Sequence, residues 1–380
     1  MSNERRPLVT VLMALYNGGE YLKQSVRSVL TQTYADFEFL IIDDCSTDNS
    51  VETVRSFQDP RIRIITNEKN VGQTKSLNVG LREARGKYAA RIDADDVALP
   101  NWLEAQVKFV QDNPQYSVVS AYGLVIDEKN RLHKSYNTPS ESDDIILRAV
   151  VHSPINHVVS LIKVEDALKV GGYTENYRIA ADYDLWRKLL HQGYQLTTNP
   201  VPLAAIRVHG ASLSHVERNT SNISEIASVI RDHVAFISNY PADEKEIKLL
   251  CDANYNESTI SYGSFLESLV VLDHVYAGIK QDVVKDINKI NLWHRIQRKT
   301  IILKRIYAFI VLKDYREVRD AAREGVKNFG WISGFGLIYS LTFLGNLAVA
   351  FIPFVYQLNR RIEALGMNKF RRQINVTGAL

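Results

Sequence analysis

The sequence contains very little cysteine and no glycine-rich nucleotide-binding motif. Only Cys45 and Cys251 occur in 380 residues, so we expect no disulfide framework and a reducing compartment. The first strand-to-helix turn reads LYNGGEYL, which is not G-x-G-x-x-G, and no G-x-x-x-x-G-K-[ST] occurs. A dinucleotide oxidoreductase and a P-loop NTPase are therefore disfavoured. The polar residues 1–6 lead directly into a strand pattern, which predicts no signal peptide.

Acidic residues are scarce near the C-terminus. Residues 291–380 contain 15 Lys and Arg residues against 5 Asp and Glu residues, whereas residues 1–290 contain 31 against 38. A basic region of this kind is attracted to an anionic surface, either lipid or nucleic acid. No recognised nucleic-acid-binding module accompanies it, so we expect no nucleic-acid partner.

Charge disappears altogether between residues 328 and 359. Residues 331–352 would form a helix about 33 Å long, which matches a hydrocarbon core of about 30 Å. Before them, WHRIQRKTIILKRIYAFIVLK mixes apolar and basic residues, as interfacial helices do. We therefore expect residues 293–372 to contact the cytoplasmic face of the cell membrane, with a bent hairpin that keeps both basic flanks on that side. An apolar helix buried in a soluble domain or in an oligomer interface is the alternative.

Strand-like and helix-like patterns alternate over the first hundred residues and continue less regularly to residue 207. Strands are expected at residues 8–15, 37–42, 61–66, 87–92, 117–126, 157–163 and 195–207. Helices are expected at residues 21–30, 49–57, 72–85, 101–112 and 180–191. This order predicts an α/β fold in which a Rossmann-like, mostly parallel sheet is sandwiched by helices.

From about residue 220 the pattern becomes almost entirely helical. We therefore expect three parts: a catalytic domain at residues 1–220, a helical region at residues 221–330, and an apolar membrane-associated segment with a basic tail at residues 331–380.

Two acidic clusters follow expected strands. Asp44 follows the second strand together with Asp43, and Asp93, Asp95 and Asp96 follow the fourth. Because ligands of open α/β sheets bind beyond the carboxyl ends of the strands, both clusters should share one rim. Alternate side chains share a side of an extended strand, so Asp93 and Asp95 should converge, with Asp96 offset. Converging carboxylates repel unless a cation lies between them, which predicts Mg²⁺ or Mn²⁺. Turn or helix capping is the alternative reading, favoured for Asp43 and Asp44 taken alone.

Six segments in this order resemble the family 2 glycosyltransferases of GT-A fold. They are LVTVLMALYNGGEYLKQSVRSVLTQTYADFEFLIIDDCSTDNS, NVGQTKSLNVGL, GKYAARIDADD, VGGY, ADYDLWRKL and RVHGASLS. The resemblance covers roughly residues 6–215. It implies metal-dependent transfer of a sugar from a nucleotide diphosphate to an acceptor hydroxyl, with inversion at the anomeric carbon.

The same resemblance implies roles for individual residues. Asp44 would read the nucleobase, and Asp93 and Asp95 match the DXD motif that meets ribose, metal and diphosphate. Asp182 in ADYDLW matches the general base that deprotonates the acceptor. Two positions depart from the family pattern, because Cys45 replaces the usual Gly and Ala181 replaces an acid.

The remaining candidates complete the metal and donor sites. Asp95, Asp96 and His209 are the expected metal ligands, His209 through its place in RVH. Tyr16 in the first turn is included in the donor-binding set. Lys75, on a helix that should start near the rim, would reach the donor phosphates, although a lone lysine on a helix is more often solvated.

The resulting hypothesis is a metal-dependent inverting glycosyltransferase. It would use a nucleotide-sugar donor, most simply a UDP-sugar, and a glycan or lipid-linked acceptor in cell-surface polysaccharide or glycolipid assembly. The alternatives are a sugar-phosphate nucleotidyltransferase, which should carry a basic loop after the first strand, and a non-catalytic membrane-bound protein that binds sugar nucleotides. Self-association stays open.

Overall fold

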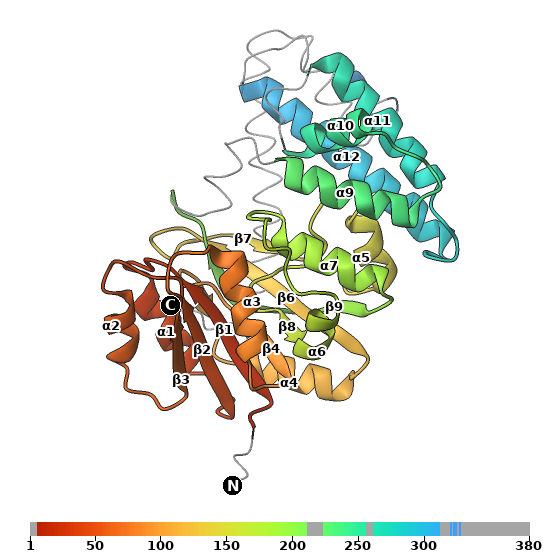
Figure 1. The fold of residues 1–380 in the computed structure, drawn as a ribbon. Coiled ribbons are helices and arrows are strands. Elements are labelled where there is room, and N and C mark those ends of the chain that lie inside the picture. Colours follow the sequence, from red (N-terminus) through yellow and green to blue (C-terminus); the bar gives the residue numbers. More distant parts are fainter. Residues whose placement is uncertain are drawn as a thin grey trace. The chain divides into compact units, whose positions relative to one another are not determined.

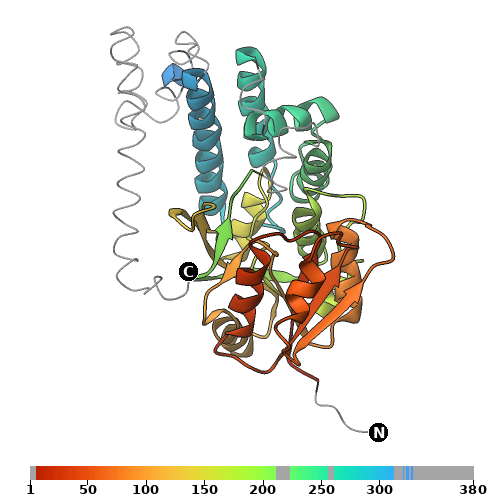
Figure 2. The same cartoon turned by 90° about the vertical axis from the view of Figure 1, so that its left-hand side faces the viewer.

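The chain forms two compact units (Figures 1 and 2). The computed structural model describes residues 6–210, 223–255 and 261–311, with a few residues between 320 and 327. The first unit is Met1–Glu225 and the second starts at Ile226. The apolar segment predicted at residues 331–380 lies outside the described residues.

The first unit is a nine-stranded sheet with helices on both faces (Figure 1). Its strands are β1 Val9–Leu15, β2 Phe37–Asp43, β3 Ile62–Thr66, β4 Tyr88–Arg91, β5 Val97–Ala98, β6 Tyr116–Ile126, β7 Leu132–Tyr136, β8 Leu161–Lys163 and β9 Gln195–Arg207. Its helices are α1 Leu22–Leu30, α2 Ser50–Arg55, α3 Gln73–Glu83, α4 Trp102–Asp112, α5 Ser142–Arg148, α6 Val164–Lys169 and α7 Ala181–His191.

The sheet is parallel in its N-terminal half and mixed beyond it. β3, β2, β1 and β4 are neighbours and all run parallel, so their carboxyl ends share one rim. β8 then runs antiparallel to both β4 and β6, while β9 runs parallel to β6 and antiparallel to β5. The predicted α/β fold class is confirmed. A mostly parallel sheet was expected, but which strands run antiparallel could not be predicted, because a strand pattern carries no information about direction.

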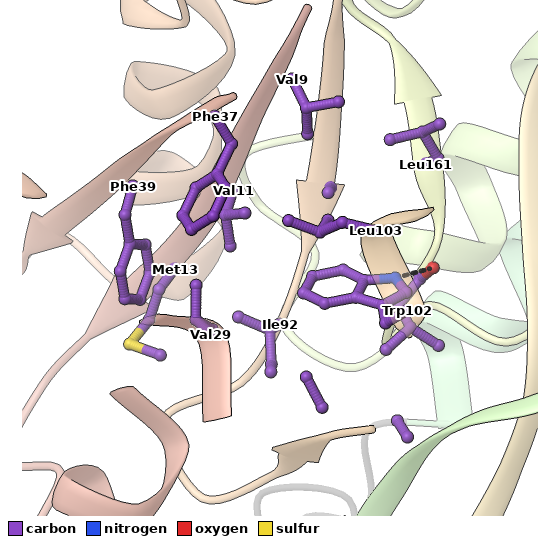
Figure 3. Packing of buried hydrophobic residues seen from close by; sticks show 14 of the residues in the cluster. Val9, Val11, Met13, Val29, Phe37, Phe39, Ile92, Trp102, Leu103 and Leu161 are labelled. Atoms are coloured by element: carbon purple, nitrogen blue, oxygen red, sulfur yellow. Dashed lines mark hydrogen bonds between the residues drawn. The ribbon is translucent and has the colours of Figure 1, made fainter. Parts of the chain in front are cut away.

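Alternate residues of the central strand enter two separate cores. Val9, Val11 and Met13 of β1 pack toward α1 and α4, whereas Leu12 packs toward α3 and α7. Figure 3 shows the first core, in which the Trp102 indole N–H donates to the carbonyl of Val159 at 3.1 Å. Burial of both faces explains why the strands read as continuous apolar runs.

Short elements account for most of the differences from the expected structure. The strand expected at residues 157–163 is reduced to β8, because Val159 has a φ of 60° that an extended strand does not allow. β5, β7, α5 and α6 were not predicted, since two to seven residues carry too little periodicity.

The second unit is helical in its described part. Its helices are α9 Ile223–Ile237, which starts at the end of the first unit, α10 Glu244–Tyr255, α11 Tyr262–Ala277 and α12 Ile287–Val311. Trp293, Ile301 and Ile302 of α12 are buried, although their pattern suggested an interfacial face. Leu292 and Ile296 are exposed instead, beside the exposed Arg295 and Lys299. Within the described residues, none of the helices combines the length and the apolar character that a membrane span requires.

Candidate active site

Three carboxylates meet immediately after β4. One oxygen atom from each of Asp93, Asp95 and Asp96 lies within 4.8 Å of the other two. Asp96, which strand geometry alone would offset, joins the group because the chain turns after β4. From α1, the Ser25 hydroxyl donates to the carbonyl of Asp93 at 2.9 Å and so fixes this turn. The predicted convergence of Asp93 and Asp95 is confirmed, whereas the predicted offset of Asp96 is wrong.

Burial and mutual repulsion disfavour the ionised form of two of these acids. Burial, followed by the charges of Asp95 and Asp93, raises the pKa of Asp96 well above its usual range. Burial and the Asp93 charge likewise raise the pKa of Asp95, with a hydrogen bond to His209 acting in the opposite direction. A divalent cation would remove this repulsion.

His209 completes the expected set of metal ligands. Its Nε2 lies 3.0 Å from Asp95 Oδ2, and its ring packs against Tyr21 with the centroids 5.2 Å apart. Clustered carboxylate oxygens with one imidazole suit Mg²⁺ or Mn²⁺, Mn²⁺ being the more tolerant of nitrogen. The converging oxygens of Asp93, Asp95 and Asp96 suit a divalent ion, and His209 reaches this group through Asp95. Ligation by Asp95, Asp96 and His209 together stays a prediction.

Arg207, two residues before His209, holds the turn that carries these ligands. Its backbone N–H donates to Asp96 Oδ1 at 2.7 Å, and its Nε donates to the carbonyl of Asp95 at 2.9 Å. The guanidinium also donates to Gln24 Oε1 and lies 4.4 Å from the centroid of the Tyr21 ring. Sequence reasoning missed Arg207, although a basic residue at the end of an apolar strand, in the same RVH segment as His209, was the available sign.

Asp44 is buried at the end of β2 and binds a loop. Its Oδ1 accepts from the side chain of Asn67 at 2.8 Å and from the Val71 N–H at 2.9 Å, and its Oδ2 accepts from the Gly72 N–H at 2.8 Å. Gly72 has a φ of 93°, which favours glycine, and precedes the first residue of α3. Both carboxylate oxygens of Asp44 are thus engaged within the protein.

Cys45 and Tyr16 both lie next to Asp44, Cys45 in the chain and Tyr16 at the end of the neighbouring strand β1. Cys45 has a φ of 65°, in the left-handed region, which explains why glycine suits this position. Tyr16 follows β1, where the carbonyl of Leu15 accepts from the Asp44 N–H at 2.7 Å, and its side chain is 49% exposed. Tyr16 therefore lies on the same rim as Asp44, with a ring open to solvent.

Helix α3 joins the Asp44 loop to the acidic cluster. Gln73, its first residue, donates from Nε2 to Asp93 Oδ1 at 3.0 Å. Lys75, two residues later, is partly buried, and no hydrogen bond or ion pair within the described residues involves it. Gln73 was not predicted as a site residue, whereas the phosphate contact suggested for Lys75 stays a prediction.

Asp182 lies at the second position of α7. Burial raises its pKa, while hydrogen bonds from the Tyr183 N–H and the Ser153 hydroxyl, and the charge of Arg91, act in the opposite direction. The Ser153 hydroxyl donates to Asp182 Oδ2 at 3.3 Å. Arg91 also pairs with Asp93, with 2.6 Å between Nη2 and Oδ1, so its charge acts on both Asp93 and Asp182.

Known proteins match the part of the chain that carries this site. The family described as Glycosyl transferase family 2 matches residues 10–162. An uncharacterized glycosyltransferase of Haemophilus influenzae is 32% identical over 251 residues, which cover 62% of this chain and 76% of the relative. This chain belongs to glycosyltransferase family 2. Its enzyme class is therefore glycosyltransferase, which disfavours the nucleotidyltransferase and non-catalytic alternatives.

Two further proteins are similar to this glycosyltransferase at lower sequence identity. The putative teichuronic acid biosynthesis glycosyltransferase TuaG of Bacillus subtilis is 29% identical over 213 residues, which cover 55% of this chain and 82% of TuaG. The crystal structure of residues 1–349 of Staphylococcus aureus TarS with UDP-GlcNAc has a TM-score of 0.52 at 16% identity, covering 81% of this chain and 91% of that chain. This structural likeness shows the shared fold.

Proposed function

We propose that this glycosyltransferase transfers a sugar from a nucleotide diphosphate to an acceptor hydroxyl with inversion of the anomeric carbon. The observation that carries the proposal is the meeting of Asp93, Asp95 and Asp96 with His209 at the rim of the sheet. A Mg²⁺ or Mn²⁺ ion held there by Asp95, Asp96 and His209 would act as a Lewis acid on the leaving diphosphate. Asp93, which contacts Arg91 and Gln73, would meet the donor beside the ion.

Other residues around this site are proposed to activate the acceptor and to bind the donor. Asp182 is the proposed general base, which takes the proton from the acceptor hydroxyl as its oxygen attacks the anomeric carbon. Its raised pKa brings this carboxylate closer to the basicity that proton transfer at neutral pH needs. Asp44 holds the loop that ends in Gly72, beside which the nucleobase would bind, and Tyr16 and Lys75 would contact the donor from the same rim.

The donor and the acceptor are proposed by analogy. TarS binds UDP-GlcNAc and shares the fold, so a UDP-sugar is the first donor to test. TuaG is named for teichuronic acid biosynthesis, which supports a glycan or lipid-linked acceptor in polysaccharide or glycolipid assembly. Contact with the cytoplasmic face of the membrane is proposed from the basic C-terminal sequence and the exposed apolar and basic side chains of α12.

A screen for nucleotide release tests the proposal. The full chain would be incubated with UDP-, GDP- and dTDP-sugars and a short glycan or polyprenyl-linked acceptor, with Mn²⁺, with Mg²⁺ or with EDTA. We expect release with one nucleotide class, loss of release in EDTA, and a product of inverted anomeric configuration by NMR. The D182N variant should lose transfer but keep nucleotide affinity, whereas D112N, on the exposed face of α4, should behave as wild type. Metal-independent turnover, or a retained anomeric configuration, would contradict the proposal.

A further inference from the structure

Asn78 is a buried amide in the middle of helix α3, and its side chain is only 4% exposed. Asparagine is a poor helix former, and burial of its amide is costly unless the amide oxygen and nitrogen form hydrogen bonds. An alanine or a leucine at this position would favour the helix more. The asparagine therefore points to a contact that lies outside the helix.

Both polar atoms of the Asn78 amide bond the backbone of Tyr173. Asn78 Nδ2 donates to the carbonyl of Tyr173 at 2.8 Å, and Asn78 Oδ1 accepts from the Tyr173 N–H at 2.8 Å. Gly172, with a φ of 64°, comes so close to the helix that a Cβ atom there would lie 2.5 Å from Asn78 Oδ1. Residues 172–174, which we call the linking segment, are therefore held against α3 by Asn78.

Helix α7 also bonds the linking segment. The ammonium group of Lys188 donates to the carbonyl of Gly172, and the Thr174 hydroxyl donates to the carboxylate of Asp184. Asp184 is buried and belongs to the first turn of α7, two residues after the proposed base Asp182. A continuous set of hydrogen bonds thus runs from α3 through the linking segment to the turn of α7 that carries the base.

The beginning of α3 belongs to the donor site. Gln73, its first residue, donates to Asp93, and the N–H of the preceding Gly72 donates to Asp44. At a rise of about 1.5 Å per residue, Asn78 lies about 7.5 Å further along the helix than Gln73. Helix α3 therefore sets the spacing between the acids of the donor site and the linking segment to which α7 is bonded.

We infer that Asn78 is a positioning residue for sugar transfer: by holding the linking segment on α3, it sets the place of Asp182 relative to the donor site. This inference rests on the proposed function, in which Asp182 is the base. Transfer requires the base, the acceptor oxygen and the anomeric carbon to be aligned, and a displacement of about 1 Å can lower the rate about a hundredfold. Thr74, one turn before Asn78, supports the same role, because its hydroxyl donates to the carbonyl of Tyr177 at 2.6 Å.

Three variants loosen the contact between α3 and the chain ahead of α7. N78A removes both hydrogen bonds to Tyr173. T74V removes the hydrogen bond from Thr74 and keeps the shape of the side chain. G172A drives a Cβ atom against the Asn78 amide from the opposite partner. Circular dichroism and thermal melting establish which variants are folded.

Two matched controls make the same chemical changes elsewhere in the catalytic unit. T197V is the control for T74V, because the Thr197 hydroxyl also donates to a distant carbonyl, that of Ser140, at 2.8 Å. G193A is the control for G172A, because Gly193 has a φ of 78° and the space that a Cβ atom would enter is open among the described residues. G193A therefore carries the backbone strain of G172A without the collision with an amide.

The split between kcat and donor affinity is the deciding kinetic measurement. With the donor identified by nucleotide release, we expect N78A and G172A to lower kcat about tenfold or more, while the Kd of the matching nucleoside diphosphate with Mn²⁺ changes less than about twofold. T74V should lower kcat less, and T197V and G193A should leave it unchanged. If Asn78 merely stabilised α3, donor affinity would fall together with kcat, because Gly72 and Gln73 at the start of this helix belong to the donor site.

Hydrogen exchange of the backbone amides tests the contact without any turnover. In N78A, the amides of residues 172–184 should exchange roughly tenfold faster than in wild type, since two buried hydrogen bonds are lost. The amides of β2 and β4, which lead to the donor-site acids, should keep their wild-type rates. T197V should match wild type in both regions.

The outcomes distinguish this inference from the proposed function. A folded N78A with normal kcat would overturn the inference, as would a diphosphate Kd that rises in step with the fall in kcat, or unchanged exchange of residues 172–184. If N78A does not fold, G172A and T74V decide by the same measurements. A wild-type protein that releases no nucleotide, or a D182N variant that transfers sugar normally, would instead refute the proposed function and not the contact, which hydrogen exchange tests by itself.

Discussion

At the scale of single residues, the acidic cluster is a source of instability that a cation would relieve. Asp96 has a pKa raised by burial and by its two acidic neighbours, so the folded protein favours its protonated form. A raised pKa in the folded state means that stability is lost as the pH rises from the unfolded value, near 4, through the folded value. We predict that metal-free D96N is more stable than wild type by about 1–2 kcal/mol at pH 8, and that this difference shrinks toward pH 4.

Thermal melting of both proteins in EDTA across this pH range measures the effect. The amide of D96N still offers an oxygen to the Arg207 N–H, so the turn is retained. Mn²⁺ should stabilise wild type more at pH 8 than at pH 5, because protons compete with the ion, and should stabilise D96N less. D112N on α4, an exposed residue, is the control. An equal difference between D96N and wild type at every pH would contradict the argument.

Cys45 gives a second residue-scale prediction. Its φ of 65° lies where a side chain costs about 1–2 kcal/mol, whereas glycine costs about 0.5–1 kcal/mol in lost chain entropy. We therefore predict that C45G is neutral to stabilising by about 1 kcal/mol, and that C45V is destabilising. C45A, which keeps the Cβ atom and removes the thiol, should match wild type. Urea unfolding measures all three, and a clear loss of stability in C45G would refute the argument.

At the scale of elements, helix α7 depends on a distant acid at its start. Glu225 Oε2 accepts from the N–H groups of Arg178, Ile179 and Ala180, at 2.9, 3.0 and 3.2 Å. These groups precede the helix whose second residue is Asp182, and a negative charge there also favours the helix dipole. We predict that E225A loses about 1–2 kcal/mol of stability and lowers kcat more than donor affinity. E175A, which changes an exposed acid ahead of α7, is the control. A destabilised E225A variant with a normal kcat would show that Glu225 stabilises the start of α7 without affecting catalysis, which contradicts the second part of the prediction.

The elements that the sequence predicts well are those with long, regular patterns. The βα alternation up to residue 92 was predictable, because β1, β2 and β4 are buried on both faces and their helices have one apolar side. The carboxylates after β4 were predictable for the same reason, since strand ends share a rim. The Glu225 cap and the Arg207 contacts were not, because each joins residues far apart in sequence and nothing local reports such distances. The burial of Arg91 was not predictable either, because it depends on the elements that pack around the end of β4.

At the scale of the whole molecule, the proposed lipid-linked acceptor would require this transferase to reach a membrane. Helix α12 contains Lys and Arg but no Asp or Glu between residues 287 and 311. Leu292 and Ile296, 55% and 40% exposed, lie beside Arg295 and Lys299, whereas Arg298 is engaged by Asp273. An exposed face that mixes apolar and basic side chains suits an anionic lipid surface.

We therefore predict that R295Q/K299Q lowers binding to vesicles of phosphatidylcholine with 30 mol% anionic lipid by about tenfold or more, since each basic residue near the surface is worth about 1 kcal/mol. L292S/I296S should weaken binding even to neutral vesicles, because its contribution is hydrophobic. L168S/K169Q is the matched control, as Leu168 and Lys169 form an exposed apolar and basic pair on α6 of the catalytic unit. Vesicle flotation in 50 and 500 mM salt measures binding, and transfer to a soluble acceptor should be the same in all variants. Unchanged flotation of R295Q/K299Q would show that α12 does not face the lipid and would leave the apolar sequence at residues 331–352 as the membrane contact.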